Sequence, residues 1–284
     1  MVHGVYLREL ARKLFGKNIS SRIWKRMEIL GDILILRKPY DVSIEKLRLL
    51  GEHLLNELTY IKSVWCSISE VKGKYRVRDF AYLCGAYRSE TVYVENETRF
   101  LIDITKVYVS PALNYEHKRV AEKVSNGEKV LNMFSGVGLF SLIMAKNKNV
   151  VVFSIDINPY AYYYMVKSIY LNSLKGKVIP ILGDSKDAVL EGTVTEVDRV
   201  LMPLPELVYD YLKYALLALK KKGYLHVYLF ASGQNRAQAR ENAVIEYTSF
   251  LRKYVKKAVI ENSRVIRSVG RRKYQVVLDY YIEK

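Results

Sequence analysis

A glycine turn and two aspartates that follow apolar runs have the types and spacing needed to bind a nucleoside. In KVLNMFSGVGLFSL an apolar run passes through Gly136 and Gly138 into a helical pattern, and glycine lets the backbone approach a ligand closely. Asp156 ends the next apolar run 20 residues after Gly136, where a carboxylate accepts hydrogen bonds from ribose hydroxyls. Asp184 ends a third run and could accept from an adenine amine. A turn-forming or helix-capping role is the alternative for either aspartate.

The same residues distinguish between two kinds of nucleoside cofactor. A dinucleotide-binding turn needs a third glycine, but Phe140 and Ser141 occupy that region, so a pyrophosphate has less reason to dock. S-adenosylmethionine carries no phosphate. The pattern therefore favours S-adenosylmethionine as the cofactor and a methyl-donor site at these residues.

Strands and helices alternate after residue 111, which is typical of a parallel sheet built from strand–helix–strand units. We predict an α/β domain with a seven-stranded, doubly wound sheet that has an antiparallel edge, and with both aspartates at carboxyl ends of strands. Strands are predicted at 129–134, 150–156, 177–184, 198–204, 223–231, 258–268 and 273–283. Helices are predicted at 114–124, 138–146, 161–174, 206–220 and 237–255.

The first 110 residues lack this alternation and predict a smaller N-terminal α+β domain. Its predicted elements are a basic helix to about residue 20, a strand at 27–39 that turns near Gly31, a helix at 43–58, a strand at 61–71, a turn at Gly73 and a hairpin at 91–105 closed at 95–97. The predicted domains are therefore 1–110 and 111–284.

An excess of basic residues points to a polyanionic partner. The chain has 46 Lys and Arg against 29 Asp and Glu, a net charge of +17, and nucleic acid is favoured over membrane because no amphipathic anchor is evident. Nine of the basic residues lie between Arg252 and Lys273, interleaved with Tyr254 and near Tyr274. A device for solubility is the alternative.

Other classes of function are disfavoured by composition. Cys66 and Cys84 make neither a disulfide framework nor a metal cluster, and the four histidines have no ligand spacing, so no metal is expected. No apolar run reaches the ~18 residues of a membrane span, and the N-terminus lacks the apolar core of a signal peptide. We therefore expect a cytoplasmic globular protein without a membrane partner.

The region 25–284 resembles the archaeal and eukaryotic tRNA guanine-37 N1-methyltransferase family, which includes archaeal members of wyosine biosynthesis. The motifs that carry the resemblance are GDILIL, KGKYRVRD, DITKVYVSPALNYEHKRV, LNMFSGVGLFS, SIDINP, LGDS, DRVLMPLP and RVIRSVGRRKYQVVLD. The resemblance implies a Rossmann-like class I methyltransferase sheet, S-adenosyl-L-methionine as cofactor, and tRNA bound at the anticodon loop around position 37. We expect a monomer. Some members carry an extra N-terminal domain at the tRNA elbow, which we expect a chain of this length to lack.

The resemblance also implies roles for single residues. Methyl transfer to guanine N1 needs a base for the N1 proton and a cation near O6, and the family motifs match Glu116 to the base and Arg76 to the cation, with Tyr108 beside them. Spacing alone would make these three a helix-surface glutamate, a strand arginine and a packing tyrosine. Besides the glycine turn, the positions matched to the methyl-donor site are Phe134, Asp156, Ile157, Asn158, Asp184 and His117. The family commonly has arginine at the position of His117, which leaves the role of that residue open.

One motif departs from the family after the fourth strand of the sheet. The family has Asn-Leu-Pro where this chain has Pro203, Leu204 and Pro205, and proline has no polar side chain and no backbone N–H. The target base must then be held differently or be another base. Wyosine biosynthesis supplies 4-demethylwyosine, in which N1 is already substituted and which is methylated at C7 to isowyosine. We expect methylation at C7, at N1 of guanosine 37, or at both, with sequence drift as the alternative explanation of Pro203.

Two other functions stay open. The superfamily includes enzymes that transfer the aminocarboxypropyl arm of the donor, and a vestigial cofactor fold would leave a non-catalytic tRNA-binding protein. Product mass and donor binding separate these from a methyltransferase. For the tRNA itself, we expect Pro203 and Pro205 near the target base and phosphate contacts from Arg271, Arg272 and Lys273.

Overall fold

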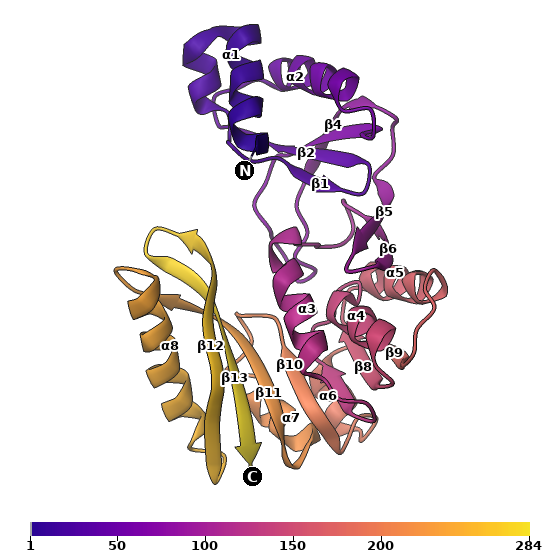
Figure 1. Ribbon diagram of the computed structural model, residues 1–284, viewed down its shortest axis with the longest axis vertical. Coiled ribbons are helices and arrows are strands. Elements are labelled where there is room, and N and C mark those ends of the chain that lie inside the picture. Colours follow the sequence, from indigo (N-terminus) through magenta and orange to yellow (C-terminus); the bar gives the residue numbers. More distant parts are fainter. Residues whose placement is uncertain (1) are drawn as a thin grey trace. The chain divides into compact units, whose positions relative to one another are not determined.

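The computed structural model describes residues 2–284, with side chains from Tyr6 onward. The chain divides into two compact units, Met1–Pro111 and Ala112–Lys284 (Figure 1). Each unit has its own sheet and its own buried core, so the two are described separately.

A four-stranded sheet and two helices form most of the first unit. Its elements are α1 (Val2–Arg22), β1 (Glu28–Leu30), β2 (Ile33–Arg37), α2 (Ile44–Glu57), β3 (Ser63–Ser67) and β4 (Phe80–Gly85), with the strands in the order β1-β2-β3-β4. α2 connects the parallel strands β2 and β3, and the outer pairs are antiparallel. Leu47, Leu50 and Leu54 recur at helical spacing and bury one face of α2 in the core.

A hairpin completes the first unit. β5 (Glu90–Glu95) and β6 (Thr98–Asp103) pair in antiparallel fashion. Asn96 and Glu97 connect them with φ angles of 46° and 60°, which is the left-handed backbone that a two-residue hairpin turn needs. The hairpin predicted from the alternating pattern is therefore confirmed.

Seven strands form the sheet of the second unit. They are β7 (Lys129–Asn132), β8 (Val151–Asp156), β9 (Lys177–Leu182), β10 (Val197–Met202), β11 (Leu219–Ser232), β12 (Lys257–Gly270) and β13 (Lys273–Glu283). Their order is β12-β13-β11-β10-β7-β8-β9, with β7 to β11 parallel and β13 antiparallel to both neighbours. The doubly wound sheet with an antiparallel edge is confirmed. The strand order reverses between β7 and β10, because β8 and β9 lie on one side of β7 and β10 lies on the other. Ligands bind open α/β sheets at such a switch point.

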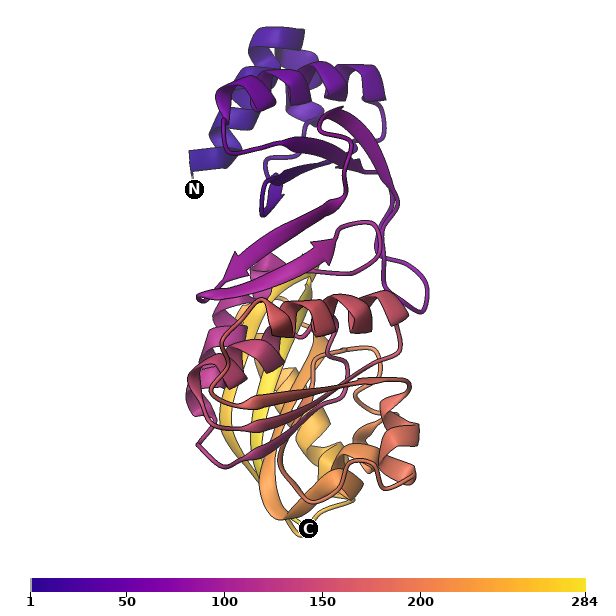
Figure 2. The ribbon, with the colours of Figure 1, turned by 90° about the vertical axis from the view of Figure 1, so that its right-hand side faces the viewer.

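Helices cover both faces of this sheet (Figure 2). They are η1 (Pro111–Leu113), α3 (Asn114–Lys123), α4 (Leu139–Asn147), α5 (Pro159–Tyr170), α6 (Ser185–Leu190), α7 (Leu212–Ala218) and α8 (Arg236–Leu251), where η1 is a single 3-10 turn. Buried residues of α6, α7 and α8 join those of the strands in one core. α4 is buried along almost its whole length, which matches its apolar sequence.

Four elements differ from the sequence-based expectation. The strand β4, the short helix α6 and the 3-10 turn η1 were not predicted, and α7 begins at Leu212 instead of residue 206. The residues before α7 form turns. Tyr209 donates a hydrogen bond to Glu246 Oε1 of α8 at 2.8 Å, and Tyr211 donates one to Asp184. These tertiary contacts favour turns over the helix that the local sequence favours.

Neither a membrane span nor a metal-ligand cluster is found in the part of the chain that the structure describes. None of its helices is long and apolar enough to cross a membrane, and no group of three or more His, Cys, Asp or Glu could hold a metal ion. Cys66 and Cys84 are free thiols in the core. Burial raises the pKa of Cys66 to about 12 and that of Cys84 to about 11, so both stay protonated at neutral pH.

Candidate active site

Asp156 joins the two loops that follow β7 and β8. Its Oδ2 accepts a hydrogen bond from the backbone N–H of Gly136 at 2.6 Å, and its Oδ1 accepts one from the N–H of Asn158 at 2.9 Å. Gly136 and Gly138 have φ angles of 54° and 85°, which residues with side chains rarely adopt. The glycine turn and Asp156 thus meet at the carboxyl edge of the sheet, beside the switch point.

The Asp156 carboxylate keeps acceptor capacity for a ligand. A carboxylate has about four lone-pair sites, and the loop amides occupy only part of them. Burial raises the pKa of Asp156, while backbone N–H groups of Asn158, Gly136 and Ile157 act in the opposite direction. Added hydroxyl donors would favour the ionised form further. The side chain of Asn158 caps α5 by accepting from the N–H of Tyr160 at 3.0 Å, and its role in binding the cofactor stays a prediction.

Asp184 is a helix cap and the partner of a partly buried tyrosine. Its Oδ1 accepts from the N–H of Lys186 at 2.9 Å, which is the capping role that the sequence left as an alternative. Tyr211 donates its hydroxyl to both carboxylate oxygens at 2.8 Å and lies edge-on to Phe134, with ring centroids 5.1 Å apart. Asp184, Tyr211 and Phe134 therefore form one cluster at the end of β9.

These groups fit S-adenosylmethionine. Asp156 offers acceptors to ribose hydroxyls, and Phe134 offers an aromatic ring to an adenine. Ser185 Oγ is buried beside Asp184 and is one of three buried polar side-chain atoms that have no hydrogen-bond partner among the residues with described side chains. A polar ligand atom would satisfy it.

Glu116 is buried in the first turn of α3. Its Oε2 accepts hydrogen bonds from Arg119 Nε at 2.9 Å and Nη2 at 2.8 Å, and Arg264 Nη1 of β12 lies 3.0 Å from Oε1. The guanidinium of Arg264 also stacks on Tyr115, with its central carbon 3.9 Å from the ring centroid. Glu116 is thus not a helix-surface residue, and two arginines balance its charge.

A second buried carboxylate, Asp279 of β13, lies on the far side of Arg119. It accepts hydrogen bonds from Arg119 and from Asn262 Nδ2 at 3.1 Å, and its Oδ1 lies 2.7 Å from Nδ1 of His226. Burial acts to raise the pKa of Asp279, but the contacts with His226 and Arg119 hold it well below its ordinary value. Burial lowers the pKa of His226, so this ring is neutral and donates from Nδ1.

Acid should destabilise the fold through Asp279. Because the pKa of Asp279 is lower in the folded chain than in the unfolded chain, its stabilising effect is complete above about pH 4 and is lost as the pH falls below that value. Asp279→Asn should cost about 3–5 kcal/mol at neutral pH because it removes one of the two buried carboxylates that pair with Arg119. Urea unfolding from pH 7 to pH 3 should show a weaker pH dependence in the variant, and an equal dependence would contradict the assignment.

His117 packs against the helix that follows the glycine turn. Its side chain is buried and lies edge-on to Phe140, with ring centroids 4.5 Å apart. This places His117 beside α4, the helix that begins directly after the glycine turn. A role in binding the cofactor stays a prediction.

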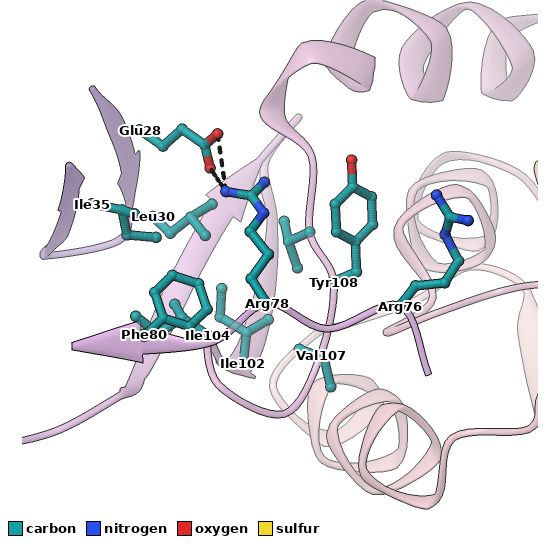
Figure 3. Close-up of a pocket in the computed structure, with 11 residues that line it drawn as sticks. Glu28, Leu30, Ile35, Arg76, Arg78, Phe80, Ile102, Ile104, Val107 and Tyr108 are labelled. Carbon is teal, nitrogen blue, oxygen red and sulfur yellow. Dashed lines mark hydrogen bonds and ion pairs between the residues drawn. The ribbon is translucent and has the colours of Figure 1, made fainter. Parts of the chain in front are cut away.

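Arg76 and Tyr108 line one hollow of the first unit (Figure 3). Arg76 is not in a strand but ends a turn closed by its own N–H, which donates to Gly73 O at 3.1 Å, and its φ is 55°. Arg78 lines the same hollow, where it donates to both oxygens of Glu28 at 3.2 and 3.3 Å and lies 5.9 Å from the ring centroid of Tyr108. The hollow therefore combines two guanidinium groups with an aromatic ring and an apolar floor.

Pro203 lies directly after β10, at the carboxyl edge of the sheet and next to β7. The two strands are held in register up to this point, since the N–H of Met133 donates to Leu201 O at 3.1 Å. Pro203 and Pro205 are partly buried. Pro203 is thus on the same edge as Asp156, where it presents an apolar ring and no hydrogen-bonding group.

The basic turn, defined as Arg271, Arg272 and Lys273, connects β12 and β13. Lys273 pairs with Ser232 at the end of β11, so the turn lies at the carboxyl edge of the sheet as well. All three residues are exposed. Phosphate groups bound by this turn would therefore lie at the same edge of the sheet as the glycine turn.

Neutralising the basic turn should weaken tRNA binding. We expect Arg271→Gln, Arg272→Gln and Lys273→Gln together to lower the slope of log K against log[salt] by about 2–3, because each lost phosphate contact removes roughly 0.7–0.9. Filter binding from low to moderate salt measures it. The matched control is Lys221→Gln, Lys222→Gln and Lys257→Gln, three exposed lysines at the opposite edge. An unchanged slope in the first variant would place the phosphate contacts elsewhere.

Several residues of the site gave no signal in the sequence. Arg119, Arg264 and Asp279 lie around Glu116, but 160 positions separate Arg119 from Asp279 and Arg264 comes from β12, so no local pattern joins them. Tyr211 belongs to a segment predicted as a helix. Only the charge of Arg264, inside the basic region, could have drawn attention to it.

Two family models match the chain. The TRM5/TYW2 methyltransferase domain matches residues 91–270, and the TYW2 N-terminal domain matches residues 7–88. Together they account for most of both compact units.

Three curated relatives illustrate the range of activities near this sequence. The tRNA 4-demethylwyosine(37)-methyltransferase Taw21 of Saccharolobus solfataricus is 39% identical over 90% of this chain and 94% of its own. The tRNA (guanine(37)-N(1))-methyltransferase Trm5b of Methanocaldococcus jannaschii is 34% identical over 98% of this chain and 77% of its own. The tRNA(Phe) (4-demethylwyosine(37)-C(7)) aminocarboxypropyltransferase of the same organism is 31% identical over 69% of this chain and 75% of its own.

Solved structures resemble the whole chain. An archaeal Trm5 in complex with tRNALeu has a TM-score of 0.83 at 33% identity and covers 98% of this chain and 78% of its own. Trm5 of Methanocaldococcus jannaschii in complex with adenosine has a TM-score of 0.80 at 31% identity and covers the same shares. These similarities extend over both compact units of the chain.

Proposed function

Because the chain belongs to the TRM5/TYW2 methyltransferase domain family, we propose that it methylates the purine at position 37 of tRNA in wyosine biosynthesis. It is an S-adenosylmethionine-dependent tRNA methyltransferase. The observation that supports the donor site is the Asp156 carboxylate, which bridges Gly136 and Asn158 at the switch point of the sheet.

For the target atom we favour C7 of 4-demethylwyosine, with isowyosine as the product. Pro203 supports this choice, because a base whose N1 is already substituted needs no hydrogen-bonding side chain at that edge. The 39% identity to the 4-demethylwyosine methyltransferase points the same way. N1 of guanosine 37 is the second candidate, supported by the 34% identity to a guanine N1-methyltransferase.

The two target atoms make similar demands on the protein. S-adenosylmethionine, when bound, supplies an electrophilic methyl group. At C7 the ring carbon bonds to the methyl carbon as the methyl–sulfur bond breaks, and C7 then loses a proton. At N1 the proton is lost from the nitrogen. In either case we assign Glu116 the acceptance of that proton. For methylation at N1 we assign Arg76 the stabilisation of the negative charge that develops near O6, with Tyr108 beside Glu116 and Arg76 in the motif order of the family.

The proposal also assigns the residues that bind the methyl donor and the tRNA. The donor site is lined by Phe134, Gly136, Gly138, Asp156 and Asp184. Next to it lie Ile157, Asn158 and His117. The basic turn binds anticodon-arm phosphates, and their contacts offset the few kcal/mol needed to flip the base at position 37. We propose a monomer that acts in the cytoplasm.

A two-substrate assay tests the target atom. Purified protein is incubated with methyl-labelled S-adenosylmethionine and, separately, with tRNA carrying guanosine 37 or 4-demethylwyosine 37. We expect label on the 4-demethylwyosine tRNA, and mass spectrometry of the nucleoside should show one added methyl group on the base. Label on guanosine 37 alone would refute C7 methylation. The mass of an added aminocarboxypropyl group would instead identify the transferase found among the relatives.

A further inference from the structure

The two oxygens of the Glu116 carboxylate have different surroundings. Oε2 accepts two hydrogen bonds from Arg119 and faces the hydroxyl of Tyr228 at 3.4 Å. Burial raises the pKa of Tyr228 well above its ordinary value, so this hydroxyl stays a donor. Oε1 has no hydrogen-bond partner among the described side chains, although Arg264 Nη1 lies 3.0 Å away. Oε2 is therefore held by hydrogen bonds, whereas Oε1 is buried and is held only by the ion pair with Arg264.

Arg119 is itself fixed by Asp279. The guanidinium that binds Oε2 of Glu116 also donates to both oxygens of Asp279, from Nη2 at 3.2 Å and from Nη1. Asp279 is held in turn by His226 at 2.7 Å. Lys123 Nζ lies 3.4 Å from Asp279, so residues of α3, β11, β12 and β13 all meet here. The side chains of Glu116 and Asp279 are 1% and 2% exposed, which leaves this arrangement almost no freedom to move.

We propose that Arg119 and Asp279 are positioning residues for the base. They hold Glu116 through Oε2, so that Oε1 is the atom that accepts the proton from the target purine. This inference rests on the proposed function, in which Glu116 is the base. Arg119 and Asp279 touch neither the donor nor the purine in this scheme and act only through Glu116.

The geometry explains why both Arg119 and Asp279 are needed to hold Glu116. Nε and Nη2 of one guanidinium both reach Oε2, so the rigid fork fixes where this oxygen lies relative to Arg119. Asp279 binds the same guanidinium, so the fork cannot swing with Glu116. A base displaced by about 1 Å loses roughly 100-fold in rate, which makes such a fixed anchor useful.

The charges around Glu116 make pH the informative variable. Arg119 and Arg264 are the cations in contact with it, Tyr228 is a neutral donor, and Asp279 faces it only across Arg119. Loss of a fixed N–H contact makes a carboxylate bind its proton more tightly. The acidic limb of the rate profile should then move to higher pH, which a purely structural role would not cause.

The experiment compares Arg119→Lys, Arg119→Gln and Asp279→Asn with the unaltered protein. The control is Lys118→Gln, an exposed change on the same helix. The readouts are kcat and KM for the tRNA found to be the substrate, S-adenosylmethionine affinity by calorimetry, and the pH dependence of kcat. For Arg119→Gln we expect kcat to fall about 100-fold with an acidic limb shifted to higher pH, and with tRNA KM and donor affinity changed less than about threefold.

The conservative variants separate positioning from folding. Arg119→Lys should recover part of the lost rate because it restores the charge but not the fork, and Asp279→Asn should lie between Arg119→Lys and the control. If Asp279→Asn no longer binds S-adenosylmethionine, we regard this variant as misfolded. The kcat of Arg119→Lys then tests the positioning role alone. Full activity in Arg119→Lys and Arg119→Gln, or a rate loss with an unmoved pH profile, overturns the positioning role. Inactivity of the unaltered protein on both tRNAs, with donor binding intact, would instead overturn the proposed function.

Discussion

Replacing Glu116 with glutamine is expected to lower kcat by about 100- to 10,000-fold, the range that a positioned general base contributes. Glutamine keeps the shape of the side chain and one oxygen acceptor for Arg119, but it cannot accept the proton of the purine. Single-turnover methylation of the substrate tRNA measures the effect. Affinity for S-adenosylmethionine should stay within a few fold, because Asp156 binds the backbone of Gly136 and Asn158, whereas Glu116 pairs with Arg119 and Arg264.

The control for this prediction lies on the same helix. Glu122 is exposed and pairs with Lys118 at 4.0 Å, so Glu122→Gln should leave the rate unchanged. Glu116→Gln also leaves Arg264 facing a neutral group, and a lower melting temperature is expected in that variant alone. Methylation by Glu116→Gln at close to the normal rate would show that another group takes the proton.

Regular elements were the part of the fold that the sequence could predict. The period of the apolar residues located the parallel strands, their helices and the β5–β6 hairpin, because each of these depends on neighbours in the chain. The segment before α7 was predicted wrongly as helix. Its conformation depends on Tyr209 and Tyr211, whose hydroxyls bond to Glu246 and Asp184 in distant elements.

The surroundings of the site were harder to predict than its central residues. Family motifs pointed to Glu116, and the structure shows that this residue is buried rather than solvated. No sequence pattern predicted Arg119 as its anchor or Asp279 as the anchor of Arg119, since Asp279 lies on β13, 160 positions after Arg119. Buried ionic networks depend on three-dimensional contacts that no period in the sequence encodes.

The position of Pro203 in the fold limits the effects that we expect from this residue. It lies at the carboxyl end of β10, beside the strand whose loop carries the glycine turn. A substitution there changes what the edge offers to a base without touching Asp156 or Glu116. We therefore expect the departure from the family motif to affect the choice of target atom more than the binding of the donor.

Replacing Asp156 with asparagine is expected to weaken S-adenosylmethionine binding by about 100-fold or more. The lost interactions are charge-assisted hydrogen bonds from ribose hydroxyls, each worth about 1.5–3 kcal/mol. The amide would also turn an NH2 group toward one of the backbone donors, Gly136 or Asn158, and disturb the loop. Calorimetry measures the affinity directly, and the melting temperature should rise with S-adenosylmethionine in the unaltered protein but barely in the variant.

The affinity should also depend on pH in a predictable direction. Donor binding needs the ionised carboxylate, so affinity is complete above the pKa of Asp156 and falls as the pH drops through it. Because burial raises this pKa above its ordinary value of 3.8, the loss should begin at a higher pH than for an exposed aspartate. The matched control is Asp187→Asn, an exposed aspartate in α6 whose removal should change neither the affinity nor its pH dependence. Tight donor binding by Asp156→Asn, with the same pH dependence as the unaltered protein, would remove Asp156 from the donor site.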